Sequence, residues 1–146
     1  MSRGFTVQGR VVVAGEAAGT LLASAEPLSF WGGYDARTGE IIDRRHPLSG
    51  QPAAGRVLAV PFTRGSSTTA QVLLEAVRNG TAPAAIVTAR VDTFISLASI
   101  VADELYQRPI PIVVLAPADF EKLQTGQAAA INRDGRIEVR SENVEW

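Results

Sequence analysis

Residues 56–79 read RVLAVPFTRGSSTTAQVLLEAVRN, and this stretch decides the fold class. It opens with a short apolar run at Arg56 to Pro61, which is typical of a buried strand, and closes with an amphipathic helix predicted over Thr68 to Asn79. The apolar residues that share one face of this helix at 3.6 residues per turn are Val72, Leu73, Ala76 and Val77. A strand that leads directly into an amphipathic helix indicates an α/β fold.

Both ends of the predicted helix carry sequence signals. Thr68 and Gln71 have the spacing of a capping box, in which each side chain bonds a free backbone amide of the first turn. Asn79-Gly80 at the other end predicts a stop in the left-handed conformation.

The alternation of strand and helix continues downstream. Ala84 to Val87 is predicted to be a buried strand, Thr93 to Tyr106 a second helix, and Ile110 to Leu115 a further strand. Wholly apolar runs of this length suit strands covered on both faces, as in a parallel sheet with crossover helices. We therefore expect a central sheet that contains parallel strands.

The two ends of the chain add mainly β-structure. The expected elements are a first strand at Phe5 to Ala14, a strand at Leu21 to Ser24, a short helix at Ala118 to Leu123, and a closing β-hairpin of Gln127 to Asn132 and Arg136 to Arg140. Glycines at positions 15 and 19 indicate the turn between the first two strands.

Residues 26–52 are predicted to form a long ordered loop. Glycines and prolines interrupt any periodicity, and only Glu40 to Asp43 is a plausible strand. Its many apolar side chains argue against disorder, and ordered loops of this length are usually functional. The carboxylates in the loop and the Arg44-Arg45 pair are assigned no chemical role, and a packing or surface role is expected for His46, the one histidine.

Composition excludes several classes of protein. The 146 residues include no cysteine, so the chain has no disulfide, no thiolate nucleophile and no cysteine ligand for a metal cluster. A net charge of -1 provides no basic field for nucleic acid. No apolar run reaches the ~18 residues of a membrane span, and we expect one cytoplasmic domain over residues 1–146.

The junction from Pro61 to Thr68 is the most informative candidate site. Ligands of open α/β sheets bind beyond the carboxyl ends of strands, and a helix N-terminus offers free amides to an anion. Arg64 could add a guanidinium fork, although the spacing alone favours a ligand-free Ser/Thr-rich helix cap. The helix N-terminus stabilises a charge by at most ~2 kcal/mol, which is too little for Ser66 to act as a base by itself. Catalysis there would require metal and cationic groups from elsewhere.

Five segments together resemble the small subunit of the aconitase X family. They are PLSFWGG at Pro27 to Gly33, DARTG at Asp35 to Gly39, IIDRRHPLSG at Ile41 to Gly50, RGSS at Arg64 to Ser67, and NGTAPAAIV at Asn79 to Val87. The resemblance implies a swivelling β/β/α domain equivalent to the fourth domain of aconitase. It also implies a large-subunit partner that holds an iron–sulfur cluster, so that this chain binds no cofactor itself.

The resemblance further implies a role for each residue of the RGSS loop. Ser66 corresponds to the serine base that removes a proton from the substrate carbon, while cluster iron binds the departing hydroxyl. Arg64, Gly65 and Ser67 would hold the substrate carboxylate. In aconitase itself an arginine follows the two serines, whereas this chain has Thr68 there, so the substrate geometry must differ.

Two substrates compete within the family: cis-3-hydroxy-L-proline, dehydrated towards Δ1-pyrroline-2-carboxylate, and (R)-5-phosphomevalonate. Lys122 is the one lysine among 14 basic residues, a bias that suggests a GC-rich bacterial genome and favours the proline derivative. A phosphorylated substrate would also be expected to recruit a larger basic cluster than Arg44-Arg45. The alternative of another class is a non-catalytic module that binds an anion or mediates assembly.

Overall fold

The computed structural model describes residues 4–65 and 67–141. Its strands are β1 (Gly4–Gln8), β2 (Arg10–Val13), β3 (Ala17–Ala23), β4 (Leu28–Ser29), β5 (Val57–Ala59), β6 (Thr63–Arg64), β7 (Ala85–Thr88), β8 (Ile112–Val114), β9 (Ala128–Ile131) and β10 (Arg136–Arg140). Its helices are α1 (Ser67–Asn79), α2 (Thr93–Tyr106) and α3 (Pro117–Phe120).

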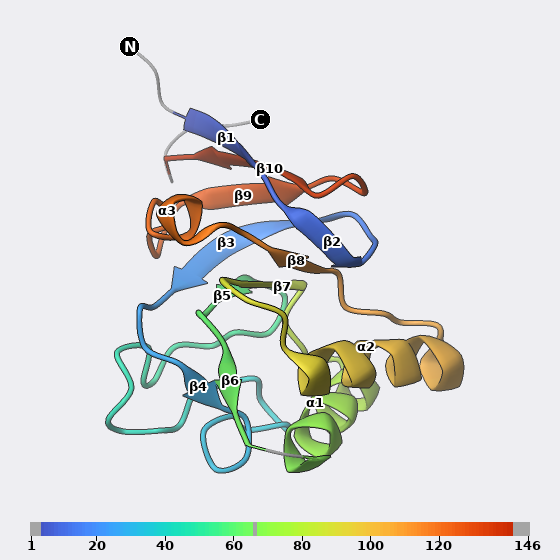
Figure 1. The fold of residues 1–146 in the computed structure, drawn as a ribbon. Coiled ribbons are helices and arrows are strands. Elements are labelled where there is room, and N and C mark those ends of the chain that lie inside the picture. The colour runs from blue at the N-terminus through green and yellow to red at the C-terminus, as the bar shows by residue number, and fades with distance from the viewer. Residues whose placement is uncertain (1–3, 66, 142–146) are drawn as a thin grey trace.

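The strands form two β-layers, and a layer of helices covers one of them (Figure 1). Strands β3, β5, β7 and β8 run parallel to one another, and β2 pairs antiparallel with β8. The second layer is antiparallel and joins β3, β9, β10 and β1. Helices α1 and α2 lie side by side beneath the parallel layer, whereas α3 lies beside β9 in the other layer. The expected α/β fold with a parallel-containing sheet is confirmed.

Side-chain alternation along the parallel strands builds two cores. Leu58 and Ile86 point into the core shared with the helices, whereas Val57 and Val87 point into the core between the two β-layers. All four side chains are fully buried. The sequence correctly predicted strands covered on both faces, but the second face is covered by the antiparallel layer.

The first predicted strand is two strands in the structure. Gly9 interrupts it, so that β1 pairs with β10 while β2 pairs with β8, at the opposite end of the strand order. A Cβ added at Gly9 would lie 2.2 Å from a Val113 methyl carbon, so only glycine fits where the chain passes from one layer to the other. The sequence pattern could not show this switch, because both halves have strand-like composition.

Two further expectations about strands are wrong. Strand β3 begins at Ala17, so Gly19 lies within a strand and marks a close approach to the Gly55 carbonyl oxygen, 2.9 Å from an added Cβ, instead of a turn. Glu40 to Asp43 does not form a strand, because its only bridges are the isolated pairs Tyr34–Ile41 and Glu40–Pro52 among the residues described. Neither pair extends into a ladder.

The long loop is ordered, as predicted, because its apolar side chains belong to the core that the helices share with the parallel strands. Its fully buried or nearly buried apolar side chains are Leu28, Phe30, Tyr34, Ile41, Leu48 and Ala53. The Phe30 and Tyr34 rings are 5.1 Å apart, and the Tyr34 hydroxyl donates a 2.6 Å hydrogen bond to the Thr81 carbonyl. Burial raises the pKa of the Tyr34 phenol, which keeps it neutral and able to donate.

Helix boundaries were predicted with mixed success. Helix α2 spans the predicted residues 93–106. Helix α1 starts at Ser67, so Thr68 lies inside its first turn and is not the predicted capping residue. Its end is as predicted: Gly80 has a φ of 77°, and the amides of Gly80 and Thr81 donate to the carbonyls of Val77 and Ala76. Helix α3 is shorter than expected and starts at Pro117.

The closing hairpin is confirmed, with β9 and β10 paired antiparallel around the turn at residues 132–135.

The helices within residues 4–65 and 67–141 are too short or too polar to span a lipid bilayer.

Candidate functional site

The candidate site lies where the parallel strands end. Strands β3, β5 and β7 finish side by side, and the residues that follow them remain bonded: the Ser24 amide donates to Ala59, and the Ala89 amide donates to Pro61, both at 3.0 Å. After β5 the chain crosses this edge to β6 and then enters α1 (Figure 1). This is the location at which ligands bind in open α/β sheets.

The long loop holds the entry to α1 in place. Strand β6 pairs in parallel with β4 from the loop, in the register Leu28–Thr63 and Ser29–Arg64. The sequence analysis missed both strands because each has only two residues. The long loop, which contains the PLSFWGG segment, therefore holds the backbone of Arg64 in place.

Asp92 fastens the same strand from the other side. One of its carboxylate oxygens accepts hydrogen bonds from the Thr63 amide, at 2.7 Å, and from the Thr63 hydroxyl. The other oxygen caps helix α2 by accepting from the Ile95 amide. Asp92 is only 8% exposed, so this carboxylate is held in a fixed position between β6 and α2. Sequence reasoning missed it, although an aspartate immediately before a predicted helix is a capping signal.

Gly65 permits the turn from β6 into α1. Its φ is 123°, which an L side chain rarely adopts, and an added Cβ would lie 2.8 Å from the Thr69 hydroxyl oxygen. Thr69 is fully buried and its hydroxyl donates to the Arg64 carbonyl at 3.4 Å. Thr69 is a second residue that sequence reasoning missed, since a threonine within a polar run carries no distinguishing signal.

The predicted site residues are found as follows. Arg64 ends β6 with its side chain exposed, Gly65 forms the turn, and Ser67 is the exposed first residue of α1. Ser66, the predicted base, lies outside the described residues. The three described residues thus meet at the N-terminus of a 13-residue helix, where free amides and the helix dipole favour an anion.

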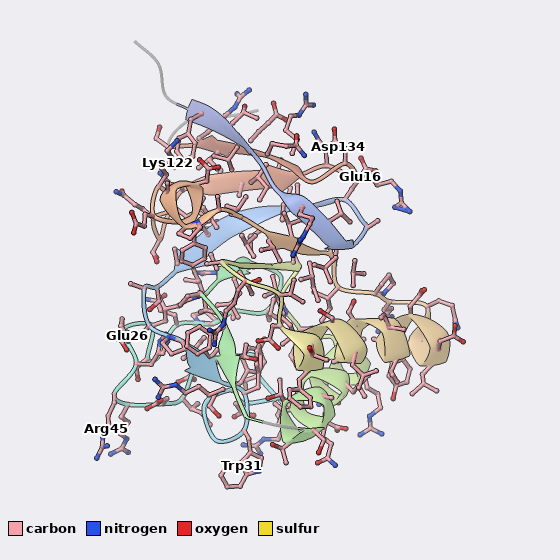
Figure 2. All side chains as sticks on the ribbon, in the orientation of Figure 1. Glu16, Glu26, Trp31, Arg45, Lys122 and Asp134 are labelled. Atoms are coloured by element: carbon pink, nitrogen blue, oxygen red, sulfur yellow. The ribbon has the colours of Figure 1, made fainter. Side chains whose placement is uncertain are left out.

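A polar recess adjoins Arg64. It has a volume of about 290 Å³ and is lined by Glu26, Pro27, Asp43, Arg45, His46, Pro47 and Arg64. Figure 2 shows Glu26 and Arg45 on the flank formed by the long loop, on the opposite side of the molecule from α2. Two arginines and two acidic residues line the recess, so both signs of charge are available to a ligand that carries both.

His46 supports the recess instead of offering a free imidazole. Its Nδ1 accepts from the Leu48 amide at 3.1 Å, and its Nε2 lies 3.3 Å from the Glu26 carbonyl oxygen. This pairing assigns the proton to Nε2, which donates to Glu26. With 7% of its surface exposed, His46 ties two parts of the loop together, in agreement with the expected packing role.

Two aspartates of the long loop form turns with backbone amides that follow them. The Asp35 carboxylate accepts from the Arg37 amide at 2.9 Å, and this hydrogen bond lowers the pKa of Asp35. Asp43 makes the equivalent bond to the Arg45 amide, which orders the backbone at the wall of the recess. These are the Asx turns that the loop composition indicates.

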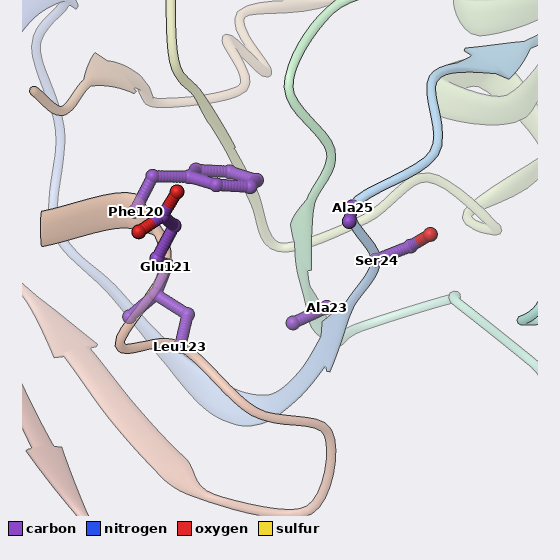
Figure 3. A pocket seen from close by; sticks show the side chains of 6 residues that line it. All are labelled: Ala23, Ser24, Ala25, Phe120, Glu121 and Leu123. Atoms are coloured by element: carbon purple, nitrogen blue, oxygen red, sulfur yellow. The ribbon is translucent and has the colours of Figure 1, made fainter. Parts of the chain in front are cut away.

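A second hollow lies between the end of β3 and the segment that begins with α3 (Figure 3). Its lining is Ala23, Ser24, Ala25, Phe120, Glu121 and Leu123, and Figure 3 shows the Phe120 ring and Leu123 facing the alanines. Glu121 is its only charged residue. It lacks the paired charges of the recess beside Arg64, so the recess is the better candidate site.

The residues of this chain do not fit an iron–sulfur cluster. There is no cysteine in the sequence, and the described residues contain no group of three His, Cys, Asp or Glu side chains that could hold a metal ion. A cluster required for activity has to be bound by another polypeptide or by another part of the protein.

Two β-layers and a helical layer give the β/β/α arrangement that the resemblance to the aconitase X family implies. Residues 6–139 match the sequence model described as the aconitase X swivel domain, and the chain belongs to this family. The resemblance drawn from the five sequence segments is thereby confirmed.

Relatives with assigned activities include two kinds of dehydratase. The chain is 45% identical over 139 residues to the cis-3-hydroxy-L-proline dehydratase of Pseudomonas aeruginosa, covering 95% of this chain and 24% of that protein. It is 40% identical over 134 residues to the phosphomevalonate dehydratase small subunit of Thermococcus gammatolerans, covering 91% of this chain and 96% of that protein. The chain thus spans about a quarter of the Pseudomonas relative, whose remaining length has no counterpart here.

The fold also matches a solved structure. The crystal structure of the holo form of Thermococcus kodakaraensis aconitase X superposes with a TM-score of 0.83 at 33% identity, over 93% of this chain and 98% of that one. The swivel-domain fold is therefore shown by sequence and by structure together.

Proposed function

We propose that residues 1–146 form one domain that acts as the small, swivelling component of an aconitase X dehydratase. The observation that carries the proposal is the RGSS loop, located at the N-terminus of α1 in a chain that matches the family from residue 6 to residue 139. The relatives named dehydratases support a hydro-lyase reaction, in which water is eliminated from a hydroxy acid.

Each residue of the loop has a part in this proposal. Ser66 is the base that removes the proton from the substrate carbon, and Arg64 pairs with the substrate carboxylate. The Gly65 and Ser67 amides contribute hydrogen bonds at the N-terminus of α1. Asp92 and Thr69 are positioning residues, because they hold Thr63 and the Arg64 carbonyl in place and so orient the loop.

The chain requires a partner for catalysis. The helix N-terminus stabilises a serine alkoxide by at most ~2 kcal/mol, so further charges must come from outside the chain. We propose that a large subunit, or the corresponding part of a fused polypeptide, closes over the loop and holds the iron–sulfur cluster. When bound, that cluster supplies a Lewis acid for the departing hydroxyl group.

The proposed substrate is cis-3-hydroxy-L-proline, which yields Δ1-pyrroline-2-carboxylate. The recess beside Arg64 supports this choice, since its mixed lining of Arg45, Arg64, Glu26 and Asp43 suits the carboxylate and ammonium groups of an imino acid. The two acidic residues offset the two arginines, so the recess offers no excess positive charge to a phosphate dianion. (R)-5-phosphomevalonate is the second candidate because of the 40% identity to the Thermococcus small subunit.

The test is a dehydratase assay with the chain and its large subunit purified together, offering both substrates separately. We expect turnover of the hydroxyproline, and a loss of about a thousandfold or more in kcat for Ser66→Ala. The neighbouring Ser67→Ala is the matched control, expected to raise KM more than it lowers kcat. Near-normal turnover of Ser66→Ala would refute the base assignment, and turnover of phosphomevalonate alone would reverse the choice of substrate.

Absence of turnover with either substrate, combined with tight binding of a carboxylic acid by the isolated chain, would instead establish a non-catalytic anion-binding module.

A further inference from the structure

Helix α2 carries an exposed apolar face, and this face has no partner within the described chain. Its large apolar residues, with their exposed fractions, are Val91 (50%) just before the helix, then Phe94 (36%), Leu97 (48%), Ile100 (54%) and Leu105 (60%). We call this set the α2 face. Their spacing of three to five residues places them along one side of the helix.

The opposite side of α2 already fulfils its structural role. Ile95, Ala98 and Ala102 are buried in the core between the helices and the parallel strands. The α2 face is therefore additional apolar surface that folding does not bury. Single exposed apolar residues are ordinary, but five of them along one helix are typical of an interaction surface.

We propose that the α2 face is the docking surface for the large-subunit part of the enzyme. This inference rests on the proposed function and extends it by assigning the interface. In the dehydratases of Pseudomonas aeruginosa and Hypocrea jecorina, the part that matches this chain is 24% and 22% of the polypeptide. The rest of each polypeptide is therefore about three times longer than this domain, and it is available to pack against it.

The connection between α2 and the RGSS loop supports this occupant over a second copy of the chain. Asp92 joins the first turn of α2 to Thr63, the residue before Arg64. Arg90, two residues before Asp92, stacks over the Phe62 ring at 3.8 Å. The α2 face thus begins beside the carboxylate that holds Thr63, so a body that docks on this face lies next to the strand that leads to Arg64.

This arrangement also gives the face a function in catalysis. A large subunit bound to α2 would be linked to β6 through the Asp92 carboxylate, which caps α2 and accepts from Thr63. Asp92 is then a positioning residue. A second copy of this chain in the same place would bring no cluster ligands, since the sequence contains no cysteine. A second copy on the α2 face would leave the proposed reaction without its cluster, so the occupant that we propose is the cluster-bearing body.

The experiment measures the affinity of the purified chain for the purified large subunit of the same organism by calorimetry. Leu97→Glu and Ile100→Glu place a carboxylate at the centre of the face, and each is expected to raise Kd by about 100-fold or more, because a charge would be buried without a partner. Leu97→Met retains apolar volume and is expected to bind within about threefold of the unaltered chain.

The matched control is Gln124→Glu, which adds the same charge at an exposed position after α3, in the other layer. It is expected to leave Kd unchanged. Both glutamate positions are about half exposed in the chain, so we expect each isolated variant to fold. Circular dichroism and thermal unfolding check this. Sedimentation of the isolated chain reports any self-association through the same face.

Each outcome is decisive. Unchanged Kd for both folded glutamate variants overturns the docking assignment while leaving the dehydratase proposal intact. The assignment is also overturned if the unaltered chain self-associates through the α2 face while Leu97→Glu abolishes that self-association and binds the large subunit with unchanged Kd. A complex that requires the α2 face but turns over neither substrate supports the docking surface and refutes the proposed reaction. Failure of the unaltered chain to bind the large subunit refutes both.

Discussion

Helices α1 and α2 cover the same face of the parallel layer and have nearly equal lengths, 13 and 14 residues, yet their outward sides differ. The exposed positions of α1 are polar, including Gln71 and the ion pair between Glu75 and Arg78. Those of α2 include Leu97 and Ile100. Packing on the sheet constrains only the inner side of a helix, so the outer side reports what else the helix contacts.

The two helices also differ in how they serve the candidate site. Helix α1 presents its N-terminus to the loop and can bind an anion directly. Helix α2 is capped by Asp92, whose carboxylate already accepts hydrogen bonds from Thr63 and from the Ile95 amide. In the function that we propose, α1 contacts the substrate and α2 holds the element that leads to it.

The strongest test of this comparison separates inner from outer positions. Leu73→Ala in α1 and Ile95→Ala in α2 remove fully buried side chains, and each is expected to lower the free energy of unfolding by about 2–5 kcal/mol. Ile100→Ala on the outer side of α2 is expected to change it by less than about 0.5 kcal/mol. Chemical denaturation of the isolated chain measures all three, and a large loss for Ile100→Ala would mean that the chain itself buries the α2 face.

The helix ends provide a test of intermediate size. Helix α1 ends at Gly80 and α2 at Gln107, both in the left-handed conformation, with φ values of 77° and 53°. Gly80→Ala is expected to lower the free energy of unfolding by about 1 kcal/mol through backbone strain alone, since no atom lies within 4 Å of an added Cβ. Gln107→Gly is expected to raise it by about 0.5 kcal/mol. Thermal and chemical unfolding measure both variants. The account is contradicted if the two substitutions change the free energy of unfolding in the same direction.

The smallest effect concerns the polar outer side of α1. Glu75 accepts a 2.6 Å hydrogen bond from Arg78, which raises the pKa of the Arg78 guanidinium. Because the pair is exposed, Glu75→Gln is expected to change stability only marginally at low salt and not at all at about 1 M salt. Proton NMR of the Arg78 side chain checks whether the contact exists, and denaturation at two salt concentrations checks its energy. A salt-independent loss would indicate that the pair is less exposed than the structure shows.

Local signals explain which features the sequence predicted well. The limits of α2 and the left-handed stop after Asn79 depend on residues within one or two helical turns. The alternation of apolar strands and amphipathic helices over 56–115 likewise requires no knowledge of distant partners, and it identified the α/β class correctly.

Features that depend on distant partners could not be predicted in the same way. Gly9 divides one strand-like run between two layers because Val113 and Gly135 lie against it. The strand β6 exists only because β4, 35 positions earlier in the register Leu28–Thr63, lies alongside it. Arg45 and Arg64 share a recess although the sequence offered no reason to pair them.

The class of fold, the family, and the Arg64 to Ser67 loop as the place where chemistry is expected could all be inferred from short-range pattern or residue identity. The folded chain was needed to show that Asp92 holds the strand leading to that loop, that the long loop supplies a charged recess beside it, and that α2 turns an apolar face outward. The physical reason is that burial and hydrogen bonding between remote segments are properties of the folded chain, and residue spacing does not encode them.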